Sequence, residues 1–159
     1  FWVGYKSDLD TQISQTQSAD INTLDFGSYG VLYPFEGSKF SHDFAWEEAV
    51  ASGGNVSYTH TFNWKLTPDS TADDLQIQKL NLGDDIFIVV EDTNQVFFIL
   101  GSGNGMSSTA SAGGSGGKES GGDTAVSGTL TSNEKILPLR FSLAGGYQAT
   151  LDYLESREG

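Results

Sequence analysis

The chain has 159 residues, the length of one domain, and its 10 Phe, 6 Tyr and 3 Trp supply apolar area for one core. It has no cysteine, which excludes disulfides, thiolate metal sites and cysteine nucleophiles. Lys and Arg number 8 against 21 Asp and Glu, a formal charge of −13, so the surface repels the phosphates of nucleic acids and anionic membranes. No apolar run reaches the ~18 residues of a membrane-spanning helix. We therefore expect a single domain over residues 1–159 that grips neither nucleic acid nor membrane.

The N-terminal part begins with aromatic residues and continues as a run rich in Ser, Thr, Gln and Asp. Because this run has no hydrophobic period, we expect residues 1–20 to form an extended N-terminal arm. From Ile21 to Tyr33 the apolar residues recur at short spacing around two glycines. This pattern predicts a bent strand or a strand pair that ends at Pro34.

The segment from Asn55 to Leu66 alternates strictly between two kinds of side chain. One face is mostly apolar and aromatic, with Val56, Tyr58, His60, Phe62, Trp64 and Leu66. The other face is polar, with Ser57, Thr59, Thr61, Asn63 and Lys65. A period of two predicts a long strand with one packed face. Residues 39–50 repeat the pattern less regularly, and the glycine-containing stretch 51–54 between the two predicts a long antiparallel hairpin.

The middle of the chain predicts one helix and a second hairpin. A Pro-containing turn, a Ser/Thr cap and a following glycine predict a short helix over residues 70–80. Two apolar runs, 86–90 and 96–100, then flank a polar turn. They predict a hairpin that is buried on both faces.

The C-terminal part contains a stretch of special composition and three expected strands. Residues 101–122 are mostly Gly and Ser, which is typical of a flexible loop. Strands are expected over 125–131 and 136–143 with a turn at 132–134, and the alternation over 147–154 favours a further strand. The fold class is therefore mainly β: a β-sandwich or open barrel of two packed antiparallel sheets with one short flanking α-helix.

No catalytic residue, cofactor site or metal site is predicted. His60 lies on the apolar face of the long strand, where a buried histidine with a satisfied hydrogen bond is expected. His42 is the other histidine, and neither has a partner at metal-ligand spacing. Adjacent acids on a strand point to opposite faces and do not converge on one ion; the acid pairs are Glu47-Glu48, Asp73-Asp74 and Asp84-Asp85. Residues 101–105 are followed by neither the lysine nor the helix of a phosphate-binding loop.

An ordered series of short motifs runs from Ser38 to Leu143. It comprises the hairpin strand 55–61, a helix ending at Leu80, the valine-rich run 88–95, the elements Phe97-Phe98-Ile99-Leu100-Gly101 and Asn104-Gly105-Met106, a Gly-rich stretch and the strand 127–131. In this order the motifs resemble the tail tube or major tail protein family of tailed bacteriophages, notably of phages of Bacteroidetes-type hosts. Gln95 stands where that family usually carries a turn glycine.

The resemblance implies a structural virion protein and no enzyme. It implies a β-sandwich whose hexameric rings stack into a hollow tail tube, a conduit for viral DNA. The partners are then the chain itself, other tail proteins and DNA in non-specific transit, in a virion tail assembled in the host cytoplasm. The polar strand face supplies an assembly interface or the lumen wall, through Ser57, Thr59, Thr61, Asn63 and Lys65.

Two alternatives remain open at this point. One is another virion protein, a tail terminator or a capsid decoration protein. The other is a secreted carbohydrate-binding β-sandwich, in which Trp2, Trp46 and Trp64 form a sugar-stacking platform. The sugar binder requires two or three of these tryptophans and nearby tyrosines to lie coplanar on the surface of a monomer. The tail protein requires them in the core or between subunits.

Overall fold

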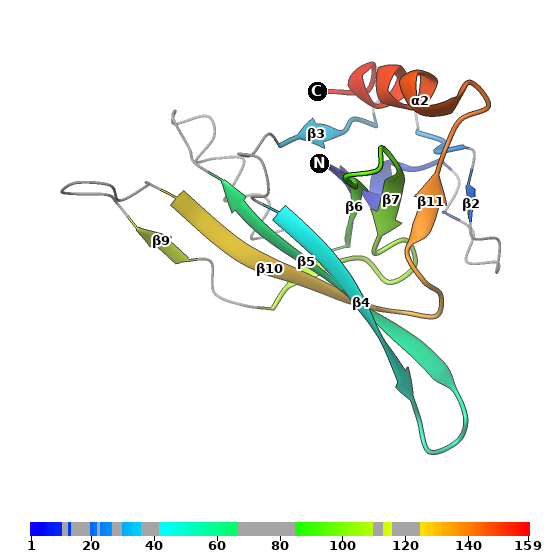
Figure 1. The fold of residues 1–159 in the computed structure, drawn as a ribbon, viewed down its shortest axis with the longest axis vertical. Coiled ribbons are helices and arrows are strands. Elements are labelled where there is room, and N and C mark those ends of the chain that lie inside the picture. The colour runs from blue at the N-terminus through cyan, green and yellow to red at the C-terminus, as the bar shows by residue number, and fades with distance from the viewer. Residues whose placement is uncertain are drawn as a thin grey trace.

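The computed structural model of the protein describes residues 1–10, 13, 20–21, 23–26, 30–35, 42–66, 85–109, 113–115 and 125–159. In these residues the chain forms two β-sheets and one α-helix (Figure 1). The sheets do not close into a barrel. The predicted mainly β architecture with one short helix is therefore confirmed, in its sandwich form.

The six-stranded sheet lies in the middle of the molecule. Its strands are, in spatial order, β2 (Asp20–Ile21), β11 (Leu139–Phe141), β7 (Phe97–Leu100), β6 (Ile86–Glu91), β1 (Trp2–Tyr5) and β3 (Tyr33–Pro34). All neighbours are antiparallel except β2, which runs parallel to β11. The β6–β7 hairpin confirms the second predicted hairpin, and β6 is buried from Ile86 to Val90. In its turn Gln95 adopts a left-handed φ of 61°, a conformation for which glycine is the usual residue.

The first residues of the chain do not form the expected arm. Strand β1 pairs with β6 on one side and β3 on the other, so that Trp2 lies opposite both Val89 and Pro34. A 3₁₀ turn, η1 (Lys6–Asp8), follows β1. The prediction fails here because the polar composition begins only after Tyr5, whereas the aromatic start has the side chains of an interior strand.

The five-stranded sheet contains the longest strands of the described structure. Its order is β4 (His42–Val50), β5 (Val56–Leu66), β10 (Ala125–Glu134) and β8 (Ser107–Ser108), and β9 (Gly113–Ser115) also pairs with β10. The β4–β5 pair confirms the first predicted hairpin. Strand β10 continues through residues 132–134, where a turn was expected, because this stretch pairs with β5 and the side chains of Ser132 and Glu134 are buried.

Two apolar clusters hold the layers together. The cluster between the two sheets is built on Val3, Phe35, Phe62, Trp64, Leu66, Ile86, Ile88, Val90, Leu100, Met106 and Leu130. The cluster on the opposite face of the six-stranded sheet is built on Trp2, Leu9, Ile13, Leu24, Phe26, Leu32, Phe87, Val89, Phe97, Ile99, Leu139, Phe141 and Leu154. The six-stranded sheet is apolar on both faces because it has a layer on each side.

The C-terminal segment is the helix α2 (Gly146–Glu155) and not the expected strand over 147–154. Its apolar side chains Tyr147, Leu151 and Leu154 have the spacing i, i+4, i+7 and pack on the six-stranded sheet. Tyr147 and Leu151 belong both to the alternation that indicated a strand and to this helical spacing. The period of the apolar residues alone therefore did not distinguish a strand from a helix. The helix expected over 70–80 lies outside the described residues.

Candidate assembly surface

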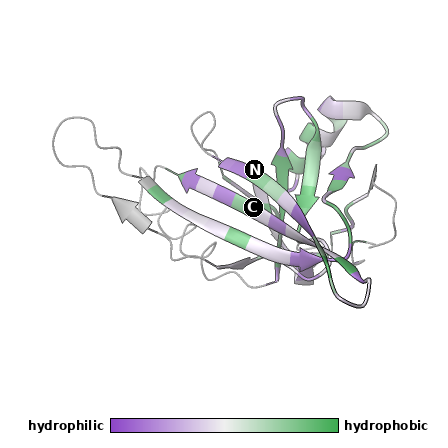
Figure 2. Cartoon of the chain, turned by 60° about the horizontal axis from the view of Figure 1, so that its bottom comes forward, coloured by the Kyte–Doolittle hydropathy of each residue, from purple (hydrophilic) through white to green (hydrophobic). Residues whose placement is uncertain are grey.

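The five polar residues predicted as an interface or lumen wall lie together on the outer face of β5. Ser57, Asn63 and Lys65 are exposed, and Thr59 and Thr61 are half-buried. Strand β5 lies between β4 and β10, so this face continues onto both neighbours. In Figure 2 the long strands of this sheet are mainly white and purple, whereas the other sheet carries more green. The described structure thus gives the sandwich one broad polar face.

Hydrogen bonds between side chains run across this face. The hydroxyl of Thr129 on β10 donates to Asn63 Oδ1 at 2.8 Å, and Asn63 Nδ2 donates to Asp43 Oδ1 on β4 at 2.7 Å. Nearer the hairpin, the hydroxyl of Thr59 donates to Asn133 Oδ1 at 3.0 Å. Short side chains that are already hydrogen-bonded to one another lose little conformational entropy when another molecule covers them. These Thr, Asn and Asp side chains also carry no positive charge that would attract a phosphate group.

The β4–β5 hairpin extends beyond the body of the sandwich (Figure 1). Strand β10, which pairs with the other side of β5, ends where Glu134 lies opposite Tyr58. Strands β4 and β5 continue beyond it to the pair Val50–Val56. On the face that continues the sandwich core, the side chains of Trp46, Val50 and Val56 are 48%, 63% and 43% exposed. An isolated two-stranded hairpin is marginally stable in water, so these exposed apolar side chains lie on the part of the sheet with the least support from its own chain.

Strand β4 is the edge of its sheet in the described part of the chain. It is nine residues long and carries Asp43, Glu47 and Glu48. Charged side chains are a common device that keeps an open edge from pairing indiscriminately. At the opposite margin β8 and β9 are only two and three residues long and consist of Ser and Gly. The two margins therefore differ in both size and charge.

His60 lies at the root of the hairpin and is fully buried. Its Nε2 is 3.0 Å from the carbonyl of Ile136, and the N–H of Gly101 donates to Nδ1 at 3.4 Å. These partners require a neutral ring with the proton on Nε2. The expected buried histidine with a satisfied hydrogen bond is therefore confirmed. Burial lowers the pKa of His60 from 6.5, while the Ile136 carbonyl and the charge of Glu134 act in the opposite direction.

The lowered pKa predicts a loss of stability in mild acid. Because the folded pKa lies below that of the unfolded chain, the unfolded chain binds more protons in the interval between them. The contribution of His60 is then fully present above pH 6.5 and decreases as the pH falls through the folded value. Urea unfolding at about pH 7.5 and about pH 5.5 is expected to show this decrease in the native protein and a smaller one in His60→Gln.

The control for this prediction is His42, whose pKa is also lowered, by burial and by the N-terminal charge, with Asp43 opposing. Its Nδ1 is buried, and none of the described residues forms a hydrogen bond with it. The variant His42→Gln keeps the two hydrogen bonds of His60 and should retain the His60 part of the pH dependence. An identical decrease in the native protein and in His60→Gln would contradict the assignment.

A buried carboxylate that the sequence analysis did not single out joins the two sheets at this root. Glu134 is 1% exposed and accepts hydrogen bonds from the N–H groups of Gly103 and Asn104, both at 3.0 Å, and from the hydroxyl of Ser132. Lys6 donates to the carbonyl of Gly103 and pairs with Asp85 at 3.0 Å. The signal in the sequence is alternation: extended past residue 131, it places Glu134 on the same face as Leu130.

The three tryptophans do not form a common platform. Trp2 lies in the cluster beneath α2 and Trp64 in the cluster between the sheets, whereas Trp46 is exposed. In the described residues, no three His, Cys, Asp or Glu side chains converge as metal ligands. The same part of the chain holds no helix long and apolar enough to span a membrane. Comparisons with protein-family models, curated proteins and solved structures gave no match.

Proposed function

We propose that the protein is a structural subunit of a bacteriophage tail tube, which assembles into stacked rings around a channel for viral DNA. The observation that carries the proposal is the outer face of β5, where five polar side chains lie in one row across the middle of an open sheet. The order of motifs from Ser38 to Leu143, which resembles the tail tube family, supports the same function.

The two unlike margins of the five-stranded sheet support a head-to-tail assembly, in which one margin of a copy meets the other margin of the next copy. The long acidic edge of β4 differs from the short Ser/Gly margin of β8 and β9, so one copy joins the next through unlike edges. Contacts between unlike surfaces close into rings when the rotation between copies permits. The backbone groups on the side of β4 that no described strand pairs then acquire hydrogen-bond partners from the neighbouring subunit.

The polar face suits the wall of a DNA channel. Lys65 is its basic residue on β5, and Asp43 and Glu47 on β4 are opposite in charge. Together with the net charge of −13, this composition repels the phosphate backbone, and DNA passes along the wall without adhering.

The burial of two of the three tryptophans disfavours the carbohydrate-binding alternative. It needs at least two coplanar exposed aromatic residues among the tryptophans and nearby tyrosines, but Trp2 and Trp64 are 8% and 2% exposed. Trp46 on the hairpin is the exposed tryptophan. Its position next to an incomplete sheet favours a contact between protein subunits over a sugar platform.

Negative-stain electron microscopy of the purified protein at increasing concentration tests the proposed function. We expect rings that stack into hollow tubes as the concentration rises. Single rings that never stack would favour a terminator or a decoration protein. Uniform monomers at every concentration would contradict the proposal, and binding of such monomers to a glycan array would establish the alternative.

A further inference from the structure

The most exposed large apolar side chains of the described structure gather at the projecting hairpin and its root. They are Trp46, Val50, Val56 and Leu137, of which Leu137 is 46% exposed. Three of them share one face of the hairpin, since Val50 lies directly opposite Val56 and Trp46 lies opposite His60. Leu137 lies in the connection from β10 to β11, next to the Ile136 carbonyl that contacts His60. Soluble monomers seldom expose such a cluster without a use for it.

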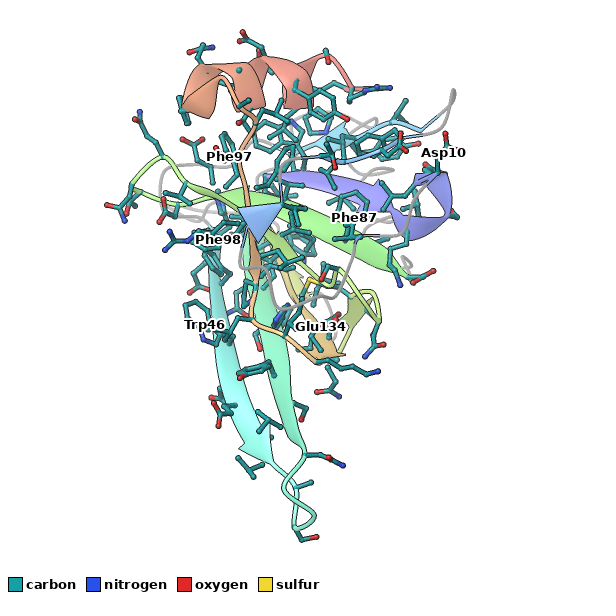
Figure 3. All side chains as sticks on the ribbon, turned by 90° about the vertical axis from the view of Figure 1, so that its right-hand side faces the viewer. Asp10, Trp46, Phe87, Phe97, Phe98 and Glu134 are labelled. Atoms are coloured by element: carbon teal, nitrogen blue, oxygen red, sulfur yellow. The ribbon has the colours of Figure 1, made fainter. Side chains whose placement is uncertain are left out.

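The cluster has two ends of different character. We call Glu48, Val50 and Val56 the tip patch: Glu48 lies opposite Tyr58, the last residue of β5 that pairs with β10, and Val50 and Val56 lie beyond that pairing. The root patch consists of Phe44, Phe98 and Arg140, whose side chains lie against one another, and of the exposed Leu137, three residues before Arg140 in the chain. The rings of Phe44 and Phe98 have centroids 5.2 Å apart, and the Arg140 guanidinium lies 5.8 Å from the Phe98 ring centre. Figure 3 shows Trp46 and Phe98 on the same flank of the molecule.

The two patches complement each other in charge and in polarity. The tip patch has two aliphatic side chains beside the carboxylate of Glu48, and the root patch has apolar side chains beside the cation of Arg140. A chain with only 8 Lys and Arg against 21 Asp and Glu offers few such cations. An exposed guanidinium beside half-buried aromatic rings suits a partner that brings both a carboxylate and aliphatic groups.

We propose that the tip patch of one copy packs on the root patch of the next copy, with Val50 against Leu137 and Glu48 beside Arg140. The inference rests on the proposed function, because it specifies which surfaces join neighbouring subunits of the assembly. The contact is heterologous: each copy offers its tip to one neighbour and its root to another. It also covers the two-stranded end of the hairpin, next to which the described part of the chain places no third strand.

The small size of the patches suits a contact that is repeated between many copies of the chain. The tip patch has only a few side chains, whereas each partner of a typical stable complex contributes about 20–30 residues. A single contact is therefore weak, and it persists where the closure of a ring or the stacking of rings provides several contacts at once. We expect assembly to depend steeply on concentration.

Cysteine cross-linking tests the contact directly, because the native chain contains no cysteine. Val50→Cys and Leu137→Cys are introduced into separate chains, and the two proteins are mixed at an assembling concentration and oxidised. We expect a disulfide-linked heterodimer, with residues 50 and 137 joined in its cross-linked peptide. A chain carrying both substitutions should give a ladder of multimers.

The matched control is Ala49→Cys mixed with Leu137→Cys. Ala49 is adjacent to Val50 and exposed like it, but it lies on the opposite face of the hairpin, so it should not cross-link. Tubes in the microscope without a link between 50 and 137 would overturn the inference and leave the proposed function intact. A link between residues 50 and 137 in a protein that never forms rings or tubes would support the contact but contradict the proposed function. Self-linked Val50→Cys dimers as the main product would also overturn it, because they require a two-fold contact.

A charge exchange tests the polar part of the contact. Glu48→Arg and Arg140→Glu are each expected to raise the concentration needed for assembly about tenfold, because each places like charges together. The double variant should assemble close to the native concentration, since it restores one pair of opposite charge. Glu155→Arg makes the same change of charge at an exposed acid of α2, on the opposite side of the six-stranded sheet, and serves as the control. Equal effects of the single and double variants would contradict a direct contact.

Discussion

Replacing Glu134 by alanine is expected to lower the free energy of unfolding by about 3–5 kcal/mol. The carboxylate is buried between the two sheets and accepts hydrogen bonds from Gly103, Asn104 and Ser132. Its loss leaves two partly buried backbone N–H groups without their acceptor, and each such group costs roughly 1–3 kcal/mol. Urea titration followed by tryptophan fluorescence measures the change.

Two further variants define the origin of that loss. Glu134→Gln keeps the size of the side chain but turns an amide donor toward one of the donors of the loop, so we expect about half of the alanine effect. Glu47→Ala removes a carboxylate from the exposed face of β4 and should change stability by no more than about 0.5 kcal/mol. A small effect at Glu134, equal to that at Glu47, would contradict the role of this carboxylate in joining the sheets.

Substituting Gly4 by alanine is expected to destabilise the protein by about 3 kcal/mol. Gly4 lies in the middle of β1, and an added Cβ would lie 2.4 Å and 2.6 Å from two ring atoms of the buried Phe87 and 3.0 Å from Leu32 Cδ2. Neither neighbour has free space, because Phe87 and Leu32 are both fully buried. The ring of Phe87 therefore occupies the volume that a side chain at position 4 would need.

The double variant Gly4→Ala with Phe87→Leu tests this packing relation. Leucine lacks the ring atoms that clash, so the double variant should be more stable than the sum of the two single effects by at least about 1 kcal/mol. Gly53→Ala in the hairpin turn is the control, because a Cβ there has no neighbour within 4 Å. Additive effects of Gly4→Ala and Phe87→Leu would show that the cost at Gly4 comes from the backbone alone.

Local patterns were sufficient wherever one face of a strand is packed and the other is wet. The alternation from Val56 to Leu66 predicted both the length of β5 and the shared polar face of Ser57, Thr59, Thr61, Asn63 and Lys65, because a strand turns successive side chains to opposite sides. It also predicted that His60 would be buried with a hydrogen bond. The two apolar runs around the turn at Gln95 predicted the β6–β7 hairpin for a similar reason.

Local patterns failed where a distant layer decides the conformation. The segment Trp2–Tyr5 forms an interior strand because β6 pairs with it on one side and β3 on the other. Residues 147–154 satisfied two periods, and their packing on the six-stranded sheet selected the helix. Glu134 reads as a turn residue in isolation and acquires its role only because the loop at Gly103 is brought to it.

The sequence by itself determined the fold class, the absence of thiol chemistry, the acidic surface and the polar face of the long strand. These properties depend on composition and on the alternation of neighbouring side chains, which the backbone converts directly into faces. Only the tertiary structure decided that β10 ends at Glu134, opposite Tyr58, while the hairpin continues. It also decided that Trp46 stays exposed while Trp2 and Trp64 are buried, and that Arg140 lies beside Phe98. Those outcomes depend on where each strand ends relative to its neighbours in the sheet. These neighbours are far apart in the chain, so their relative lengths are fixed only in the folded sheets.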